Sequence, residues 1–309
     1  MTGAVLLALL PIVVLIVLGM ALRHRGFLAE SFWPQAERLG YYVLLPCLFF
    51  YGLATVQIKT IPVGMLSLTL ILATLVVAML VIALRPLMRI DDPAFTSVFQ
   101  GSVRFNNYVG VTLAAGMFGA NGIAMAAVCN AAIVPTVNVL CVLVFARYGA
   151  VKLTRCGILK QLTTNPLVVA SLSGIAFHLL GLHLPPGLGP AIQTLGAASL
   201  PLGLLCVGAA LEFHTARQWV GPVASSSAIK FLAMPVMTVA LARLTGLQGP
   251  ALTTALLFQA LPTASSAYIM ARQLGGDAPL MAGITAMQTV IALIALPMVL
   301  IGLSMVIQL

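Results

Sequence analysis

The feature that most constrains the fold is a succession of apolar stretches, each long enough to cross a lipid bilayer. A transmembrane helix needs about 20 predominantly apolar residues, and such runs follow one another along the whole 309-residue chain. Ten of them are expected to be membrane spans: 4–22, 38–56, 61–84, 95–118, 122–146, 165–183, 190–211, 223–245, 250–272 and 280–306. Composition agrees, because 61% of the residues are hydrophobic and only 7% are charged. The sequence therefore predicts an all-α membrane protein that has the lipid bilayer as a partner and carries no soluble domain.

The basic residues predict how the chain is oriented in the membrane. The formal net charge is +9, but the Lys and Arg side chains are dispersed over short loops next to the apolar stretches. Eleven of the fifteen lie in loops that follow odd-numbered stretches. Loops rich in Lys and Arg stay on the cytoplasmic side. We therefore expect a multi-pass protein of the plasma membrane with both termini outside, an uncleaved first span and no nucleic-acid partner.

The two halves of the chain resemble each other weakly. The segment "PIVVLIVLG" at 11–19 is similar to "PLVVASLSG" at 166–174, and the same separation of 155 residues relates Pro46 to Pro201. Residues 1–149 and 150–309 are accordingly predicted to be two five-helix repeats. Because five is an odd number, the second copy would be inverted in the membrane. Inverted repeats are typical of secondary transporters, whose substrate site lies near the midplane where interrupted helices meet.

Polar residues interrupt two spans that this repeat relates to each other. The segments "SVRFNNYVG" at 102–110 and "PTASSAYI" at 262–269 align at a separation of 159 residues. A proline such as Pro262 breaks a helix, because it lacks an N–H and clashes with the carbonyl four residues before it. The polar side chains of both segments are expected to bind substrate together: Arg104, Asn106, Asn107, Tyr108, Thr263, Ser265 and Ser266.

Arg104 is the most costly of these residues, because it lies near the middle of a span. Inserting an arginine there costs roughly 2.5–3.5 kcal/mol. All six acidic residues fall in loops or at span ends, so no carboxylate is expected beside Arg104. Two roles stay open: it binds a substrate anion through two parallel hydrogen bonds, or it holds backbone carbonyls that a helix break sets free. Lys230 lies nearer a span end and is expected to extend to the membrane interface.

Other patterns exclude some functions and leave two alternatives open. The chain contains no HExxH, GxSxG or Walker motif, so we expect no enzyme and neither a cofactor nor a metal. One alternative is a cation-coupled symporter or a cation/proton antiporter of the same fold. In that case transport would depend on sodium or on a proton gradient. The cation would be bound by side-chain oxygens, including those of Gln100, Asn130, Gln259 and Gln288. The other alternative is a non-transporting membrane sensor subunit.

Three segments resemble the auxin efflux carrier family of membrane transporters. They are "NNYVG" at 106–110, "NPLVV" at 165–169 and "ALPTASSAYIMA" at 260–271. The family includes bacterial permeases for malonate or malate and the plant auxin carriers. The resemblance extends over nearly the whole chain, and the short connection 147–164 is similar to that of the compact bacterial form, which resides in the inner membrane.

The resemblance implies an inverted five-plus-five fold in which spans 4 and 9 break and cross. Spans 1, 2, 6 and 7 would form a scaffold, and spans 3–5 and 8–10 a transport domain that moves in an elevator-like way. By position, Phe105, Pro262 and Ala264 fall at the crossover, and Pro46 and Pro201 on the scaffold face. The implied cargo is a small organic anion such as malonate, malate or an auxin-like acid. Its identity, the coupling ion and a homodimeric state stay open, as does the exact break in span 4, which lacks the proline of many relatives.

Overall fold

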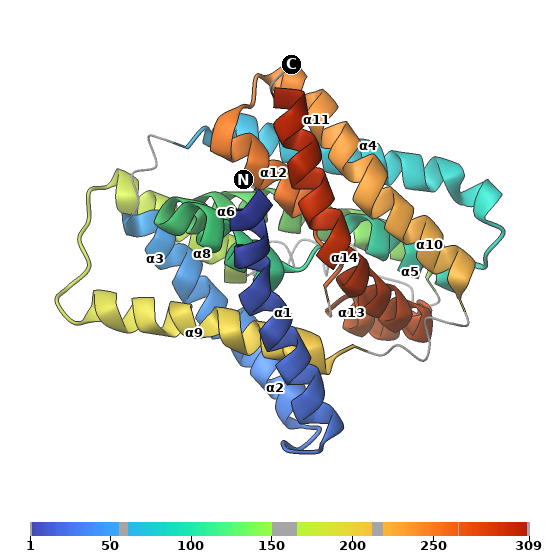
Figure 1. Ribbon diagram of the computed structural model, residues 1–309, viewed down its shortest axis with the longest axis horizontal. Helices are drawn as coiled ribbons and strands as arrows, with labels where there is room; N and C mark the ends of the chain where they lie inside the picture. The colour runs from blue at the N-terminus through green and yellow to red at the C-terminus, as the bar shows by residue number, and fades with distance from the viewer. Residues whose placement is uncertain (1, 56–60, 150–165, 212–218, 265, 308–309) are drawn as a thin grey trace. The chain divides into compact units, whose positions relative to one another are not determined.

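A computed structural model describes residues 2–55, 61–149, 166–211, 219–264 and 266–307. These residues form helices and their connections, and no β-strand occurs among them, which confirms the all-α class. The helices labelled in Figure 1, together with the π-helical turns η1 and η4, have the following bounds: α1 Thr2–His24, α2 Phe32–Leu39, η1 Gly40–Leu44, α3 Leu45–Thr55, α4 Val63–Met88, α5 Asp92–Val103, α6 Asn107–Tyr148, α8 Pro166–Leu179, α9 Leu188–Ala209, α10 Val220–Ala228, η4 Ile229–Ala233, α11 Met234–Thr245, α12 Gly249–Gln259, α13 Ser266–Leu274 and α14 Ala278–Ile307.

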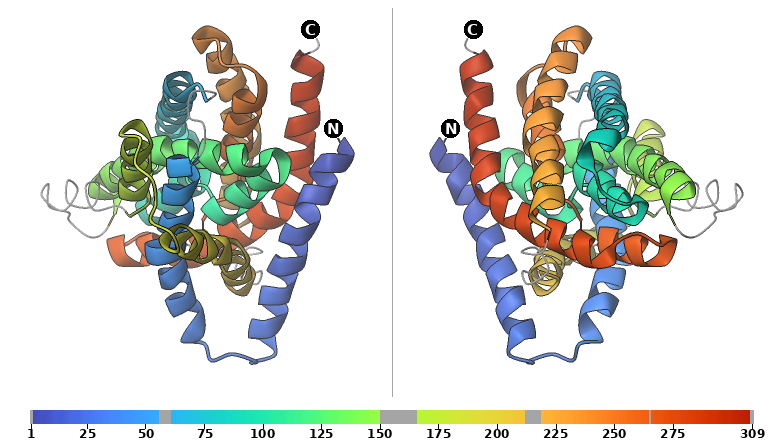
Figure 2. Two further views of the ribbon diagram at one scale, coloured as in Figure 1. Left: turned by 90° about the vertical axis from the view of Figure 1, so that its left-hand side faces the viewer. Right: turned by 90° about the vertical axis from the view of Figure 1, so that its right-hand side faces the viewer.

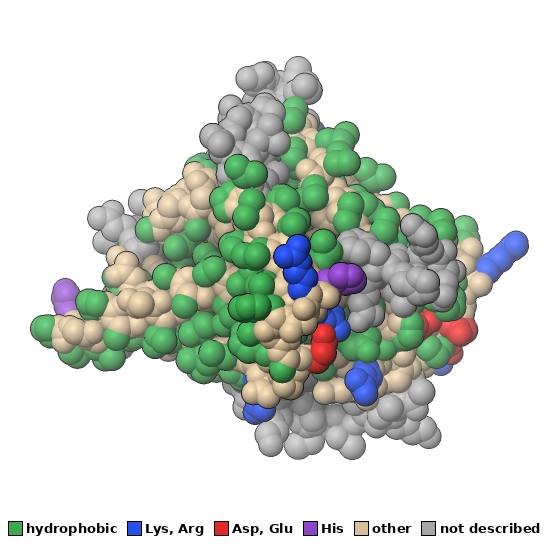
Figure 3. Space-filling view, turned by 60° about the horizontal axis from the view of Figure 1, so that its bottom comes forward, with side chains coloured by type: hydrophobic (Ala, Val, Ile, Leu, Met, Phe, Trp, Pro, Cys, Tyr) green, Lys and Arg blue, Asp and Glu red, His purple; other side chains and the backbone are tan. Residues whose placement is uncertain are grey.

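The helices have the length and composition of membrane spans. Among the described residues, six helical segments are long and apolar enough to cross a membrane: Phe32–Thr55, Val63–Met88, Asp92–Tyr148, Leu188–Ala209, Val220–Thr245 and Ala278–Gly302. Large apolar side chains such as Leu232, Val236 and Ile294 expose 67%, 68% and 68% of their surface. Hydrophobic side chains cover much of the surface in Figure 3, with few charged ones between them. Such a surface suits a multi-pass membrane protein, whose helices face lipid.

The chain divides into two compact units, and each unit draws segments from both halves of the sequence. Unit 1 comprises residues 1–63, 107–131 and 163–209, and unit 2 comprises residues 64–106, 132–162 and 210–309. The long helix α6 contributes to both units. It is interrupted at Gly119, where φ is 58° and ψ is −136°. A glycine adopts this conformation without the steric penalty of a side chain. The two parts of α6 on either side of Gly119 correspond to the second part of the predicted span 95–118 and to the whole predicted span 122–146.

In unit 1, small residues allow helices to pack closely. Helix α1 packs against α9, and α3 packs against both α8 and α9. A Cβ atom at Gly208 would overlap the backbone of Ile16, and one at Gly19 would overlap the backbone of Leu205. Membrane helices commonly approach each other through such positions. Figure 2 shows that α1 and α2 are joined at one end by a short connection.

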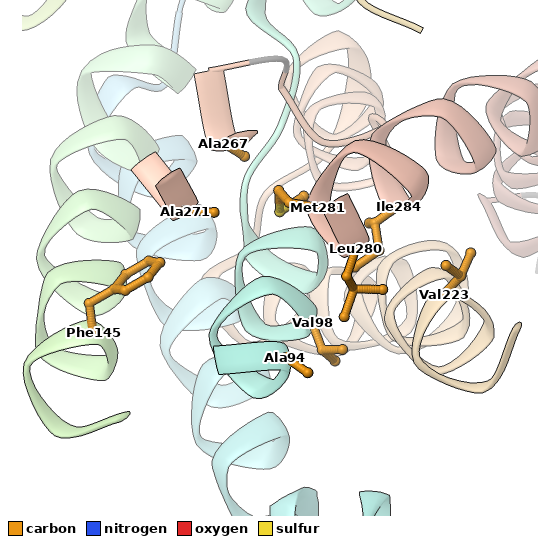
Figure 4. Close-up of a cluster of buried hydrophobic side chains, with 9 residues drawn as sticks. All are labelled: Ala94, Val98, Phe145, Val223, Ala267, Ala271, Leu280, Met281 and Ile284. Carbon is orange, nitrogen blue, oxygen red and sulfur yellow. The ribbon is translucent and has the colours of Figure 1, made fainter. Parts of the chain in front are cut away.

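In unit 2, a cluster of buried apolar side chains joins the helices on either side of the two polar segments. Figure 4 shows its members, which come from α5, the last part of α6, α10, α13 and α14: Ala94, Val98, Phe145, Val223, Ala267, Ala271, Leu280, Met281 and Ile284. The cluster packs α5, which ends at the first polar segment, together with α13, which begins after the second.

Each π-helical turn lies shortly before a proline. Pro46 follows η1 and Pro235 follows η4. The turn η4 closes with a hydrogen bond from the N–H of Met234 to the carbonyl of Ile229, five residues back. A proline ring clashes with the carbonyl four residues before it, and a wider turn relieves this clash within a continuous helix. In η4 this widened turn carries Lys230.

Candidate functional site

Both polar spans are interrupted at their polar residues. Helix α5 ends at Val103 and α6 begins at Asn107. Arg104 lies in this gap with an extended backbone, φ −74° and ψ 160°. In the second span, α12 ends at Gln259 and α13 begins at Ser266. Each interruption leaves backbone N–H and carbonyl groups without a partner in their own helix, so other groups must satisfy them.

The two helix breaks contact each other within unit 2. The N–H of Asn106 donates a hydrogen bond to the carbonyl of Pro262 at 2.8 Å. The rings of Phe105 and Phe258 pack edge to face, with centroids 5.7 Å apart. Irregular backbone is tolerated at membrane depth where protein surrounds it. The mutual contact of the breaks meets this requirement and brings two segments together that are far apart in the sequence.

Gln288 on α14 holds the backbone at both breaks. Its Oε1 accepts a hydrogen bond from the N–H of Thr263 at 3.0 Å. Its Nε2 donates to the carbonyl of Gly101 at 3.0 Å and to Oγ of Ser226 at 3.1 Å. The side chain is completely buried. One glutamine therefore connects α5, α10 and the segment after α12. Its predicted role as a ligand of a coupling cation stays a prediction.

Arg104 is partly buried beside the breaks, and its contacts include the neutral side chains of Asn138 and Met270. Its Nη1 lies 3.4 Å from Oδ1 of Asn138 and 3.2 Å from Sδ of Met270. Within the part of the chain that the structure describes, Arg104 forms no ion pair. One of the two roles predicted from the sequence was that Arg104 binds backbone carbonyls. The structure instead shows it in contact with side chains of α6 and α13. Among the described residues, the positive charge of the guanidinium therefore has no counter-charge.

The other predicted site residues of unit 2 surround the second break. Thr263 is completely buried, and its hydroxyl has no hydrogen-bond partner among the described residues. Pro262 is buried, whereas Ala264 and Ser266 are partly exposed. Ser265 lies outside the described residues. The structure thus brings Arg104 into the same unit as these residues, and their joint binding of a substrate stays a prediction.

Asn107 and Tyr108 begin α6 and belong to unit 1. The Tyr108 side chain lies against two glycines: its hydroxyl approaches Gly40, and a Cβ atom at Gly203 would overlap its ring. The buried Oδ1 of Asn107 accepts no hydrogen bond from any described residue, so this oxygen does not cap α6. The prediction that these two residues share a site with those of unit 2 stays a prediction.

The amides predicted to bind a coupling cation differ in their surroundings. The buried Asn130, in unit 1, donates its amide hydrogen to a carbonyl one turn back in α6. In unit 2, Nε2 of Gln259 donates to the carbonyl of Leu70 at 3.2 Å and to Oγ1 of Thr74 at 3.1 Å. Gln100 is completely buried, and neither atom of its amide has a partner among the described residues.

The repeat-related prolines both lie in unit 1. Pro46 is the second residue of α3 and is half-buried, whereas Pro201 lies inside α9 and is exposed. Helices α3 and α9 pack against each other. Both positions are compatible with kinks in packed helices, and a scaffold face formed by them stays a prediction.

The position of Lys230 differs from the one expected from the sequence. The sequence predicts a side chain that extends to the membrane interface, but the structure shows Lys230 with 0% exposure. Its turn, η4, packs against α5 and α14. The depth of a residue along a span can be estimated from the sequence, but the side of the helix that faces other protein cannot. The interior position of this lysine is therefore a result of tertiary packing.

The comparison with known families settles which kind of protein contains these two broken helices. A model of the family described as "Membrane transport protein" matches residues 4–300, which is nearly the whole chain. The chain belongs to this membrane transport protein family. The match confirms the resemblance to the auxin efflux carriers. An "Uncharacterized transporter" of Methanothermobacter thermautotrophicus is 24% identical over 297 residues, which cover 94% of this chain and 95% of that protein. As a member of this family with several apolar helices, the chain is a multi-pass membrane transporter.

Proposed function

We propose that this membrane transport protein is a secondary carrier of a small organic anion. The cargo is a carboxylate such as malonate, malate or an auxin-like acid. The observation that carries the proposal is the guanidinium of Arg104, which has no counter-charge among the described residues and lies beside two broken helices that contact each other.

An anion suits this place for electrostatic reasons. A buried cation without a counter-charge is costly, and an arriving carboxylate removes that cost. A guanidinium also matches a carboxylate in shape, because two N–H groups can donate to two oxygens in parallel. The helix α13 begins at Ser266, directly after the second break, and a helix N-terminus adds partial positive charge. These groups together favour anionic over neutral or cationic cargo.

The proposed mechanism is alternating access in an inverted-repeat fold. Ten spans would form two five-helix repeats, residues 1–149 and 150–309, in the plasma membrane with both termini outside. Spans 3–5 and 8–10 would move as an elevator against spans 1, 2, 6 and 7. Helices α4, α5 and α10–α14 fall in one compact unit and α1, α3, α8 and α9 in the other, but residues 107–131 of predicted spans 4 and 5 fall in the unit of the scaffold helices. A change of access by movement of one bundle is the usual mode of inverted-repeat carriers.

A sodium-coupled carrier of the same fold is the main alternative. It requires free oxygen ligands, because sodium binds hard oxygen donors. The oxygen of Gln288 already accepts the N–H of Thr263. The oxygens of Gln100 and Thr263, in contrast, have no partner among the described residues. Uptake measured with and without sodium decides between the two: uptake without sodium would favour the proposal, and a strict sodium requirement would favour the alternative.

The test of the proposal is exchange in proteoliposomes. Vesicles that contain the purified protein and unlabelled anion are supplied with labelled malonate, malate or indole-3-acetate outside. Wild-type protein should take up at least one of them. Arg104→Gln should reduce uptake about 10- to 100-fold, since a hydrogen bond to a charged group contributes roughly 1.5–3 kcal/mol. Arg104→Lys should retain only part of the activity, because an ammonium cannot form the paired bonds.

The matched control is Arg243→Gln, which removes a charge from an exposed position in the last turn of α11. It should behave like wild type. Full uptake by Arg104→Gln would refute a direct role of Arg104. Lack of uptake of every tested anion by wild-type protein would refute the proposed function.

A further inference from the structure

Lys230 is a fully buried lysine in the turn η4. Its exposure is 0%, and Nζ forms no hydrogen bond with any residue that the structure describes. An ammonium group in such a place is costly, because it leaves water and gains no counter-charge. Packing alone does not call for a lysine, since an apolar side chain of similar length fills the same space without that cost. The residue therefore needs an explanation beyond packing.

Lys230 lies next to the junction that holds the helix breaks together. One turn before it, Ser226 approaches Gly101 so closely that a Cβ atom at Gly101 would overlap the serine hydroxyl. Both residues are hydrogen-bonded by Gln288. Gln100, next to Gly101, is completely buried and has an amide without partners among the described residues. Two polar side chains that have no partner among the described residues, one on α5 and one on η4, thus flank the same junction between packed elements.

The elements packed against η4 supply no counter-charge to Lys230. These elements are α5, α10, α11 and α14, and α10 and α14 contain no ionisable side chain. On α5, Asp92 is paired with Arg85, and the capping residue Asp91 accepts an N–H of its own helix. On α11, Arg243 is positive and exposed. Among the residues that the structure describes, these elements therefore offer no charge to balance a protonated Lys230, and an entering anion can supply it.

We propose that Lys230 takes up a proton together with the anionic cargo, so that the carrier moves an anion and a proton in one step. The inference rests on the proposed function, because the anion supplies the missing counter-charge. In the empty carrier the amine is neutral. When an anion enters unit 2, the lone pair of Nζ binds a proton from water, and the same proton returns to water when the anion leaves.

Proton uptake and anion binding are then linked. Each bound anion takes up one proton, and by reciprocity the proton strengthens anion binding. Where Lys230 of the empty protein is neutral, anion affinity falls by up to about tenfold for each unit that the pH rises. A monovalent anion moves without net charge, so a membrane potential has little effect on its rate.

The test measures protons and anions in the same sample. Full-length protein in weakly buffered detergent solution is mixed with malonate or malate, at pH values above the pKa values of the anion, so that the cargo releases no proton. A pH-indicator dye reports proton uptake, and calorimetry reports affinity over a pH series. Wild-type protein should take up close to one proton per anion. Lys230→Met should take up none and bind with an affinity that is independent of pH.

Two further variants secure the interpretation. Lys230→Arg keeps a permanent charge, so it should bind the anion without proton uptake at every pH, and it decides the question if Lys230→Met does not fold. Arg243→Met makes the same kind of change at an exposed site and should retain wild-type coupling. Anion binding by wild-type protein without proton uptake, or equal uptake by Lys230→Met, would overturn the inference and leave the proposed function intact. Absence of anion binding by wild-type protein would overturn the proposed function itself.

Discussion

Replacing Gln288 by methionine tests whether one side chain holds the two helix breaks together. Gln288→Met preserves length and volume, so it leaves no large cavity, but it removes every hydrogen bond of the amide. Three buried groups lose their partner: the N–H of Thr263, the carbonyl of Gly101 and the hydroxyl of Ser226. The Gly101 carbonyl lies in the last turn of α5, where no intrahelical N–H is available to it.

The expected loss follows from these three bonds. Hydrogen bonds between membrane helices contribute about 0.6 kcal/mol on average and up to about 1.7 kcal/mol. Three such bonds correspond to about 2–5 kcal/mol of unfolding free energy. Gln248→Met is the matched control, because this exposed glutamine precedes α12 and forms no capping bond with its side chain. Its effect should stay within about 0.5 kcal/mol.

The two tryptophans of the chain, Trp33 and Trp219, allow each unit to be observed separately. Trp33 lies in unit 1, and Trp219 packs beside the buried cluster of unit 2. In a Trp33→Phe background, fluorescence during equilibrium unfolding in mixed micelles with a denaturing detergent reports on unit 2. In a Trp219→Phe background it reports on unit 1. Gln288→Met should shift the transition of unit 2 more than that of unit 1.

A loss below about 1 kcal/mol in the transition of unit 2 would refute this reasoning, since it would mean that the three bonded groups find other partners at little cost. An equal shift of both transitions would refute the assignment of the effect to unit 2. Gln288→Glu refines the result, because a carboxylate keeps an acceptor for Thr263 and loses the amide donors. It should destabilise unit 2 at least as much as Gln288→Met, because the buried carboxylate is unpaired and faces the Gly101 carbonyl.

Three further predictions concern packing and charge. Gly203→Ala should destabilise unit 1 by about 1–3 kcal/mol, because the new methyl group overlaps the ring of Tyr108; the fluorescence of the tryptophan in α2 measures it. Arg85→Gln should cost unit 2 about 1–2 kcal/mol, because the guanidinium lies over aromatic rings of α5 and α6; the other tryptophan measures it. Asn138→Asp should reduce anion exchange at least about tenfold, because the new carboxylate neutralises Arg104.

Each of these predictions has a matched control. Gly189→Ala changes the same helix as Gly203 at a position where a Cβ atom meets only ordinary contacts, and equal destabilisation would contradict the role of the close approach. Arg243→Gln removes an exposed charge without an aromatic neighbour among the described residues. Asn138→Leu removes the same amide without adding charge, so exchange as low as in Asn138→Asp would contradict the electrostatic explanation.

Much of the helical structure could be predicted from the sequence, because its causes are local. Apolar runs of span length must be helical in a membrane, where each backbone group needs a partner in its own segment. The interruption near Pro262 follows from the chemistry of a single residue, and that near Arg104 coincides with a polar cluster. The ten-span inverted repeat and the use of these residues to bind an anion remain proposals.

Contacts between distant segments could not be predicted, because no local signal carries them. Gln288 lies 187 residues from Gly101 and Asn138 lies 34 residues from Arg104. Which pairs meet depends on how the helices pack. The sequence alone does not tell whether a polar residue within an apolar span faces lipid or another helix. Four glutamine and asparagine residues looked alike as cation ligands for this reason, and only their partners distinguish them.

The sequence by itself determined that this chain is an all-helical membrane transporter with two interrupted spans, because hydrophobicity, length and proline act on residues close in the chain. The tertiary structure alone decided that the two interruptions touch, that Gln288 joins them and that Lys230 is buried without a counter-charge among the described residues. These features arise where side chains from several helices exclude water and lipid together, and the cost of an unpaired group then depends on every neighbour that packing supplies.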